Sequence, residues 1–219
     1  TVGTPVKIPF GRAETHGIIM NIAAFSSSKV KNLKEISAPL EKIPSLSPQI
    51  IAFLLWFKEY YQLTPYKAYQ TIMGSNKLRL LKEEEHKFSK KEKTHQLTKE
   101  QKEIITTILK SKGAASFLLF GVTSSGKTEI YLQIAQEILN IGKTVLILLP
   151  EIALTPQMTK IFQERFGTGV AVIHSGLTPK QREIAWNKVY QEKAQIVLGP
   201  RSAIFSPLKN IGLIVVDEE

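Results

Sequence analysis

A phosphate-binding loop in the second half of the chain constrains its fold more than any other feature. Residues 121–128 read GVTSSGKT and match the pattern G-x-x-x-x-G-K-S/T, in which backbone N–H groups surround a phosphate. The loop follows the apolar run Ser116–Phe120 and precedes a helical pattern at 128–140. Because such a loop places phosphate at the N-terminus of a helix, we predict a strand–loop–helix unit in an α/β domain that binds a nucleotide.

Each residue of the loop has an expected role. Lys127 should reach the β- and γ-phosphates, and Thr128 should bind Mg²⁺ through its hydroxyl. The backbone of the preceding residues should surround the phosphates; they are Gly121, Val122, Thr123, Ser124, Ser125 and Gly126. The predicted cofactors are therefore ATP and Mg²⁺.

The only aspartate of the chain, Asp217, follows the apolar run Leu213–Val216. A single acid at the end of a strand is often structural or a helix cap. Here the phosphate loop supplies a magnesium ion that needs a second oxygen ligand, so we interpret Asp217 as that ligand. Glu218 is then placed to orient or deprotonate the attacking water. The predicted catalytic residues are Lys127, Asp217 and Glu218.

From residue 97 onward, short apolar runs alternate with helical patterns. Besides 116–120, the runs are Val145–Leu149, Val170–Ile173, Gln195–Leu198 and Leu213–Val216, and further helices are expected at 156–166 and 179–193. This alternation predicts a parallel sheet with helices on both faces. Ligands of such sheets bind at the carboxyl ends of the strands.

Three polar segments follow strands of this predicted sheet: 150–157, 174–176 and 199–203. Each segment taken alone is more typical of a turn than of a site. Their Ser, Thr and Arg side chains are suited to contact a DNA backbone, and their common position favours a shared binding role. His174 and Ser175 are candidate contacts on this ground.

The first half of the chain has a different pattern. Residues 5–22 predict a β-hairpin and 26–46 a loop, whereas Ser47 and Pro48 mark the start of a helix and Pro65 opens a second one that ends near Gly74. The helical spacing of the aromatic residues favours a buried core, and a base-stacking surface is the alternative. They are Phe53, Trp56, Phe57, Tyr60, Tyr61, Tyr66 and Tyr69. We predict domains at 1–75 and 97–219, joined by a charged linker at 76–96.

The charge indicates a polyanionic partner. The chain has 29 Lys and Arg against 19 Asp and Glu, a net charge of +10, and residues 1–96 hold 15 of the basic and 8 of the acidic residues. Nucleic acid is the simplest such partner, although many soluble proteins are basic. The absence of cysteine excludes disulfides and thiolate metal sites from these residues. No apolar run is long enough to cross a bilayer, so we expect a cytoplasmic protein without a membrane partner.

Gln101 has two interpretations. Thr98 and Gln101 match a capping box at the start of a helix. Alternatively, an amide upstream of a phosphate loop recognises adenine through paired hydrogen bonds.

The motifs GVTSSGKTEIYL, LLPEIALTPQ, HSGL, VLGPRSAIFSP and LIVVDEE, in this order, resemble the family of primosomal protein N′, the bacterial replication-restart helicases of superfamily two. VKIPFGR, GIIMNI and WFKEYY resemble the DNA-binding domain of that family more loosely. The resemblance implies a RecA-like P-loop lobe with a parallel sheet, preceded by a small β-rich and helical DNA-binding domain. It also implies an ATP-driven 3′-to-5′ helicase that binds branched DNA and restarts stalled forks by primosome assembly.

The resemblance assigns further residues. Gln101 would read adenine, and Asp217 and Glu218 would be the acids of a DEAH-like motif. Contacts to single-stranded DNA would come from Thr155, Pro156, Gln157, Arg201 and Ser202. The implied partners are forked and single-stranded DNA, primosome proteins and single-strand-binding proteins. Ser124 and Pro200 depart from the family, which usually has glycine and threonine at these positions.

The resemblance also implies parts that these 219 residues do not hold. No room is left for the family's winged-helix domain, and we expect the second lobe, its arginine finger and its zinc-binding cysteines beyond Glu219. Zinc is therefore expected only there. Since an arginine finger contributes about 10³–10⁵ in rate in comparable enzymes, we expect no helicase activity and near-background ATP hydrolysis from this chain. The alternatives are another superfamily-two DNA translocase, or a fork-binding module without catalysis.

Overall fold

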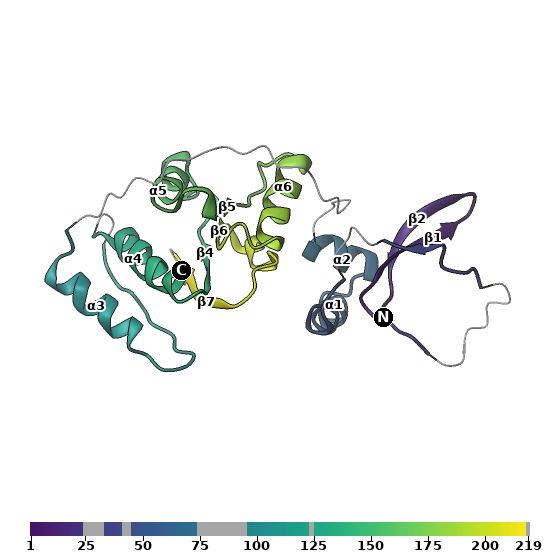
Figure 1. Ribbon diagram of the computed structural model, residues 1–219, viewed down its shortest axis with the longest axis horizontal. Coiled ribbons are helices and arrows are strands. Elements are labelled where there is room, and N and C mark those ends of the chain that lie inside the picture. The colour runs from purple at the N-terminus through teal and green to yellow at the C-terminus, as the bar shows by residue number, and fades with distance from the viewer. Residues whose placement is uncertain (24–32, 41–44, 74–95, 123–124, 218–219) are drawn as a thin grey trace. The chain divides into compact units, whose positions relative to one another are not determined.

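The computed structural model describes residues 1–23, 33–40, 45–73, 96–122 and 125–217. The chain divides into two compact units, Thr1–Lys82 and Glu83–Glu219 (Figure 1). None of the helices in the described ranges is both long enough and apolar enough to span a membrane.

The first unit contains a three-stranded antiparallel sheet in the order β2-β1-β3. Strands β1 (Pro5–Phe10) and β2 (Ala13–Ile18) form a hairpin, and β3 (Ala38–Pro39) pairs with the other edge of β1. The tight turn between β1 and β2 uses Gly11, whose φ of +63° suits glycine. The predicted hairpin is confirmed.

Two helices complete the first unit. Helix α1 (Pro48–Tyr60) begins where the sequence predicts, because the Ser47 hydroxyl accepts a hydrogen bond from the Ile50 N–H at 3.3 Å. Helix α2 (Pro65–Met73) follows, and Gly74 lies outside the described residues. The small core of the unit is made by Val6, Leu46, Ile51, Leu54, Phe57, Ala68 and Ile72.

The prediction that the aromatic residues are core is wrong for most of them. Phe57 is buried, but Trp56 and Tyr60 are 53% and 65% exposed. Their rings stack along one side of α1, with centroid distances of 5.6 Å from Phe53 to Trp56 and 5.1 Å from Trp56 to Tyr60. Helix α1 has two apolar faces, and the core of this unit buries only the one that carries Leu54 and Phe57. We call Phe53, Trp56 and Tyr60 the aromatic ladder.

The second unit contains a four-stranded parallel sheet in the order β5-β6-β4-β7. Its strands are β4 (Thr144–Leu148), β5 (Val170–Val172), β6 (Ile196–Gly199) and β7 (Ile211–Val216). Four of the five predicted strands are thus confirmed, with small shifts at their ends. A parallel sheet of this kind supports the RecA-like fold class that the sequence predicts.

Helices cover both faces of this sheet. Helices α4 (Lys127–Asn140) and α5 (Pro156–Phe166) pack on one face, where Leu132 and Phe162 contact Ile147 and its neighbours. Helix α6 (Pro179–Tyr190) packs on the other face, where Val189 meets Leu146 and Val197. Residues 146 and 147 face opposite sides because successive side chains of a strand alternate. Helix α3 (Lys99–Leu109) contacts α4.

The predicted strand at 116–120 is wrong, since the structure assigns no strand to these residues. Leu119 packs on the cores beneath α4, but Leu118 and Phe120 are 90% and 93% exposed. A strand needs a neighbour for its backbone hydrogen bonds, and in the described ranges no strand pairs with this segment. Its apolar composition therefore did not suffice to make it a strand.

Candidate nucleotide-binding site

The phosphate loop leads into α4, as predicted. Gly126 precedes the helix with a φ of +84°, a left-handed conformation that favours glycine. The Glu129 N–H donates to the Gly126 carbonyl at 3.1 Å, which closes the first turn. The unpaired N–H groups of a helix start can bind an anion. Thr123 and Ser124 lie outside the described residues.

Lys127 lies against the loop that precedes it. Its ammonium donates to the carbonyl of Gly121 at 2.6 Å and to that of Val122 at 3.2 Å. The ammonium group of Lys127 therefore lies against the phosphate loop. The lysine itself is the first residue of α4, whose N-terminus is the predicted phosphate site.

Gln101 makes the capping box that its first interpretation requires. Its side-chain oxygen accepts from the Thr98 N–H at 2.9 Å, and its own N–H donates to the Thr98 hydroxyl at 3.2 Å. The amide nitrogen of the same side chain touches the phosphate loop, because a methyl group on Gly126 would overlap it. Gln101 therefore forms the capping box of α3 and also lies beside the phosphate loop. Its recognition of adenine stays a prediction.

Asp217 follows β7 and is held at two points. Its backbone N–H donates to the Leu148 carbonyl at 3.0 Å, which extends the pairing of β7 with β4. Its Oδ1 accepts from the Tyr131 hydroxyl at 2.9 Å. Burial raises the pKa of Tyr131, and the hydrogen bond and charge of Asp217 raise it further, so the hydroxyl remains a donor. Glu218 lies outside the described residues.

A second polar contact, also missed by the sequence analysis, joins α4 to α5. The Glu129 carboxylate lies 3.6 Å from the guanidinium of Arg165, and both side chains are nearly buried. Gln133 also donates to Glu129 at 2.7 Å. In the sequence, these residues follow the phosphate loop or end a helix, and nothing local indicates that they meet.

The oxygen donors near the loop suit Mg²⁺. Among the described residues no group of three or more His, Cys, Asp or Glu side chains could hold a metal by itself. Mg²⁺ usually takes one or two protein oxygens and completes its shell with water and phosphate. Thr128 lies in the first turn of α4, and Oδ1 of Asp217 is bound to a side chain of the same helix. This pair of donors fits such a metal.

The three polar segments all follow strands of the sheet, as predicted. Thr155 caps α5 by accepting from the Met158 N–H at 3.2 Å, and Pro156 is the first residue of that helix. His174 and Ser175 lie in a turn after β5, where Arg182 donates to the Ser175 carbonyl. Arg201 and Ser202 begin a 3₁₀ helix, η2 (Arg201–Phe205), after β6. All the candidate contacts except His174 are exposed, Gln157 included.

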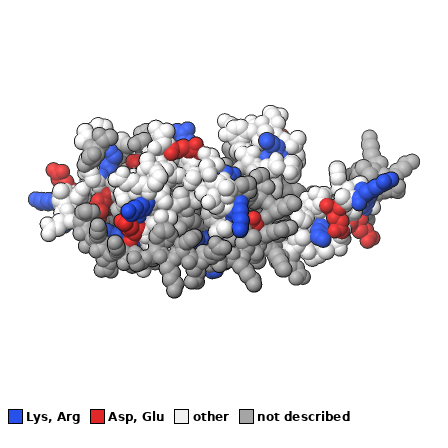
Figure 2. Space-filling model, turned by 90° about the horizontal axis from the view of Figure 1, so that it is seen from above, with Lys and Arg blue, Asp and Glu red and all other residues white. Residues whose placement is uncertain are grey.

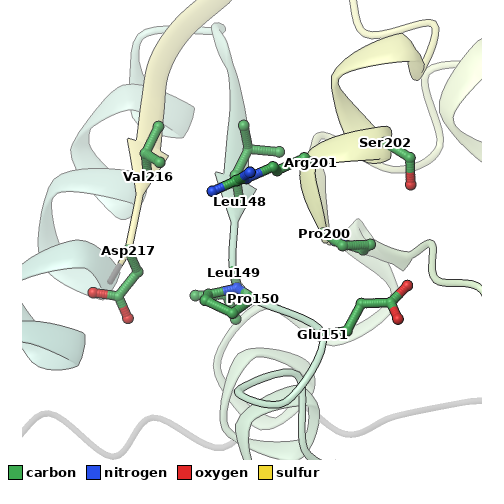
Figure 3. Close-up of a pocket in the computed structure, with 9 residues that line it drawn as sticks. All are labelled: Leu148, Leu149, Pro150, Glu151, Pro200, Arg201, Ser202, Val216 and Asp217. Atoms are coloured by element: carbon green, nitrogen blue, oxygen red, sulfur yellow. The ribbon is translucent and has the colours of Figure 1, made fainter. Parts of the chain in front are cut away.

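An open cavity of about 430 Å³ connects two parts of this region. Figure 3 shows Asp217 on one side of the end of β4 and the segment Pro200–Ser202 on the other. The predicted magnesium ligand and two of the predicted DNA contacts therefore line one cavity. Pro200 is part of its wall.

Most of the basic residues of the first half lie outside the described ranges. Of the 15 Lys and Arg in residues 1–96, ten lie outside the described ranges. On the face shown in Figure 2, blue and red side chains of the described residues are interspersed. The net charge is therefore an argument from composition alone.

Comparison with known proteins agrees with this geometry. Residues 98–219, more than half of the chain, match the family model described as DEAD/DEAH box helicase. The chain belongs to the DEAD/DEAH box helicase family. Residues 1–74, which include the aromatic ladder of this helicase-family chain, match a model described as 3′ DNA-binding domain.

Three relatives of this helicase-family chain carry the name replication restart protein PriA. The protein of Synechocystis is 52% identical over 124 residues, which cover 57% of this chain and 15% of the relative. The proteins of Treponema pallidum and Rickettsia felis are each 34% identical in alignments that cover this whole chain and 34% and 33% of the relative. The chain thus spans about a third of the length of the relatives that it matches from end to end.

Proposed function

We propose that the chain is part of an ATP-dependent 3′-to-5′ DNA helicase that binds branched DNA and acts in replication restart with primosome and single-strand-binding proteins. One observation carries the ATPase part of this proposal. The phosphate loop opens α4, and the same helix holds the acid at the end of β7 through the Tyr131–Asp217 hydrogen bond. The matches to a helicase model and to a 3′ DNA-binding domain support the rest.

The residues of the site suggest a division of work. Lys127 exchanges the carbonyls of Gly121 and Val122 for phosphate oxygens, and Gln101 contacts adenine. Thr128 and Asp217 hold magnesium, which neutralises charge on the phosphates when bound. Glu218 orients or deprotonates the attacking water.

Two substitutions separate binding from catalysis. We expect Lys127→Ala to abolish ATP binding because it removes the positive charge at the β- and γ-phosphates. Glu218→Gln should leave binding intact because its carboxylate acts on water. Equilibrium titration with a fluorescent ATP analogue measures both. If both variants lose binding, the assigned roles are wrong; if Lys127→Ala binds as tightly as the unchanged chain, the loop is not the nucleotide site.

We propose that these 219 residues alone hydrolyse ATP at near-background rates. By resemblance, the arginine that completes the site comes from a second lobe, and such a residue is worth about 10³–10⁵ in rate. A phosphate-release assay with and without single-stranded DNA tests this. DNA-stimulated turnover of several per second would contradict it.

The aromatic ladder is a surface suited to single-stranded DNA in the first unit. Each base that stacks on an aromatic side chain contributes about 1–3 kcal/mol, and Trp56 and Tyr60 are both exposed residues. Fluorescence anisotropy with forked and single-stranded DNA across a salt series tests the contact. We expect Trp56→Ala to weaken binding about tenfold, in line with that energy. Phe10→Ala, an exposed aromatic outside the ladder, is the matched control, and equal losses in both variants would exclude the ladder.

A further inference from the structure

Tyr131 is a buried side chain of α4 that contacts the predicted catalytic residue Asp217 and has no assigned role. It is 9% exposed and packs in the core between α4 and the sheet. Its hydroxyl donates to Oδ1 of Asp217 at 2.9 Å, across 86 residues of sequence. Tyr131 comes four residues after Lys127 and therefore lies one helical turn further along the same side of α4.

We propose that Tyr131 is a positioning residue that orients the Asp217 carboxylate for the magnesium ion. The inference rests on the proposed function, in which Asp217 is a magnesium ligand. Tyr131 occupies Oδ1 and leaves Oδ2 for the metal or for a water bound to it. Tyr131 itself touches neither nucleotide nor metal.

The setting of Asp217 explains why its orientation needs support. The residue follows β7, an edge strand of the sheet in the described ranges, and the pairing of its N–H with Leu148 holds its backbone only. A carboxylate on such a backbone can adopt several rotamers, and ordering it upon metal binding has an entropic cost. A hydrogen bond from a packed ring removes that freedom in advance. Since the ring belongs to α4, the acid is tied to the helix that begins with Lys127 and Thr128.

A group that donates a hydrogen bond to a metal ligand affects metal affinity. Removing such a group commonly weakens metal binding or activity by about 10–100-fold. Phenylalanine keeps an aromatic ring in the core cluster that includes Ala135 and Val215 and removes the hydroxyl alone. Asp217 is half-buried, so water can replace that hydroxyl and the variant should remain folded.

The experiment measures binding of a fluorescent ATP analogue to the whole 219-residue chain, in EDTA and across a Mg²⁺ titration. We expect Tyr131→Phe to raise the Mg²⁺ concentration at half-effect about tenfold and to leave binding in EDTA unchanged. The electron paramagnetic resonance spectrum of Mn²⁺ in place of Mg²⁺ should broaden in the variant. Tyr190→Phe is the matched control, because that ring stacks on Trp186 in α6 and is expected to change neither reading.

A double variant separates positioning from a general structural role. Asp217→Asn should remove most of the Mg²⁺ effect, and adding Tyr131→Phe to it should then change nothing more. The inference is overturned if Tyr131→Phe leaves the Mg²⁺ titration unchanged, if it weakens binding in EDTA equally, or if it acts equally in the Asp217→Asn background. If the unchanged chain binds ATP without any effect of Mg²⁺, the proposed site fails, and the inference with it.

Discussion

Strands β4 and β7 are alike in composition and different in position. Val145, Leu146 and Ile147 of β4 are 0%, 1% and 0% exposed. In the neighbouring strand β7, Ile214 and Val216 are 53% and 50% exposed. Strand β4 pairs with β6 on one side and β7 on the other, whereas β7 is the edge strand of the sheet in the described part of the chain.

The difference shows that an apolar run predicts a strand but does not predict how much of that strand is buried. Both runs have the β-branched composition of a strand inside a parallel sheet. The helices on both faces and a strand on each side complete the surroundings of β4. In β7, only alternate residues such as Leu213 and Val215 meet the core. Position in the sheet therefore decides how much a substitution in each strand costs.

The largest expected effect is a polar substitution on the central strand. Ile147→Asn should destabilise the second unit by about 4 kcal/mol or more, because it removes a buried side chain and buries an amide without partners. Ile214→Asn, the same change in β7, should cost less than about 1 kcal/mol. Urea denaturation followed by circular dichroism measures both. Equal losses would mean that β7 is as enclosed as β4.

A smaller effect is expected from glycine substitutions in the two kinds of strand. In β6, a methyl group on Gly199 would overlap the backbone carbonyl of Ile173, which cannot easily move. In β7, a methyl group on Gly212 would lie 2.8 Å from side-chain atoms of Ile138 and Lys143. We expect Gly199→Ala to cost about 2–3 kcal/mol and Gly212→Ala about 1 kcal/mol. Thermal denaturation of the two variants tests this order, and the reverse order would contradict it.

The smallest expected effect concerns an exposed ion pair just before β7. Lys209 donates to Glu192 at 2.6 Å, and its carbonyl accepts from the Thr144 hydroxyl at the start of β4. The hydrogen bond and charge of Glu192 raise the pKa of Lys209. A lysine whose pKa is raised by folding stabilises the fold below its ordinary pKa of 10.5, and that contribution is lost as pH rises through the raised value.

Because the pair is exposed, its contribution to stability should be barely measurable. NMR titration of the Lys209 side chain gives a sharper reading. We expect Glu192→Gln to lower the pKa of Lys209 and to leave the denaturation midpoint at neutral pH nearly unchanged. A Lys209 pKa that does not respond to Glu192→Gln would show that the contact is absent in solution.

Local signals predicted much of the fold and the centre of the site. The capping box at Thr98 forms as expected, because all its donors and acceptors lie within one helical turn. The phosphate loop before α4 is likewise predicted from eight adjacent residues. Asp217 follows a strand, as the apolar residues before it indicate. In each case the partners are neighbours in sequence.

The errors and omissions have a common cause. In the described ranges, the segment 116–120 has the composition of a strand but no strand beside it. The aromatic ladder has helical spacing, yet its side chains are exposed in the described part of its unit. The contacts Tyr131–Asp217 and Glu129–Arg165 join residues far apart in sequence. No periodicity encodes such pairs, and the tyrosine in the apolar pattern of α4 is indistinguishable from an ordinary core residue.

The sequence by itself determined three patterns: a phosphate-loop motif before a helix, a single aspartate after an apolar run, and the alternation that makes a parallel sheet. Those properties depend on residue type and short spacing. Only the tertiary structure decided which strand is central, which aromatic rings stay exposed and which side chain holds Asp217. Burial and long-range hydrogen bonds depend on how elements distant in sequence pack together. The sequence of one strand does not specify which elements pack against it.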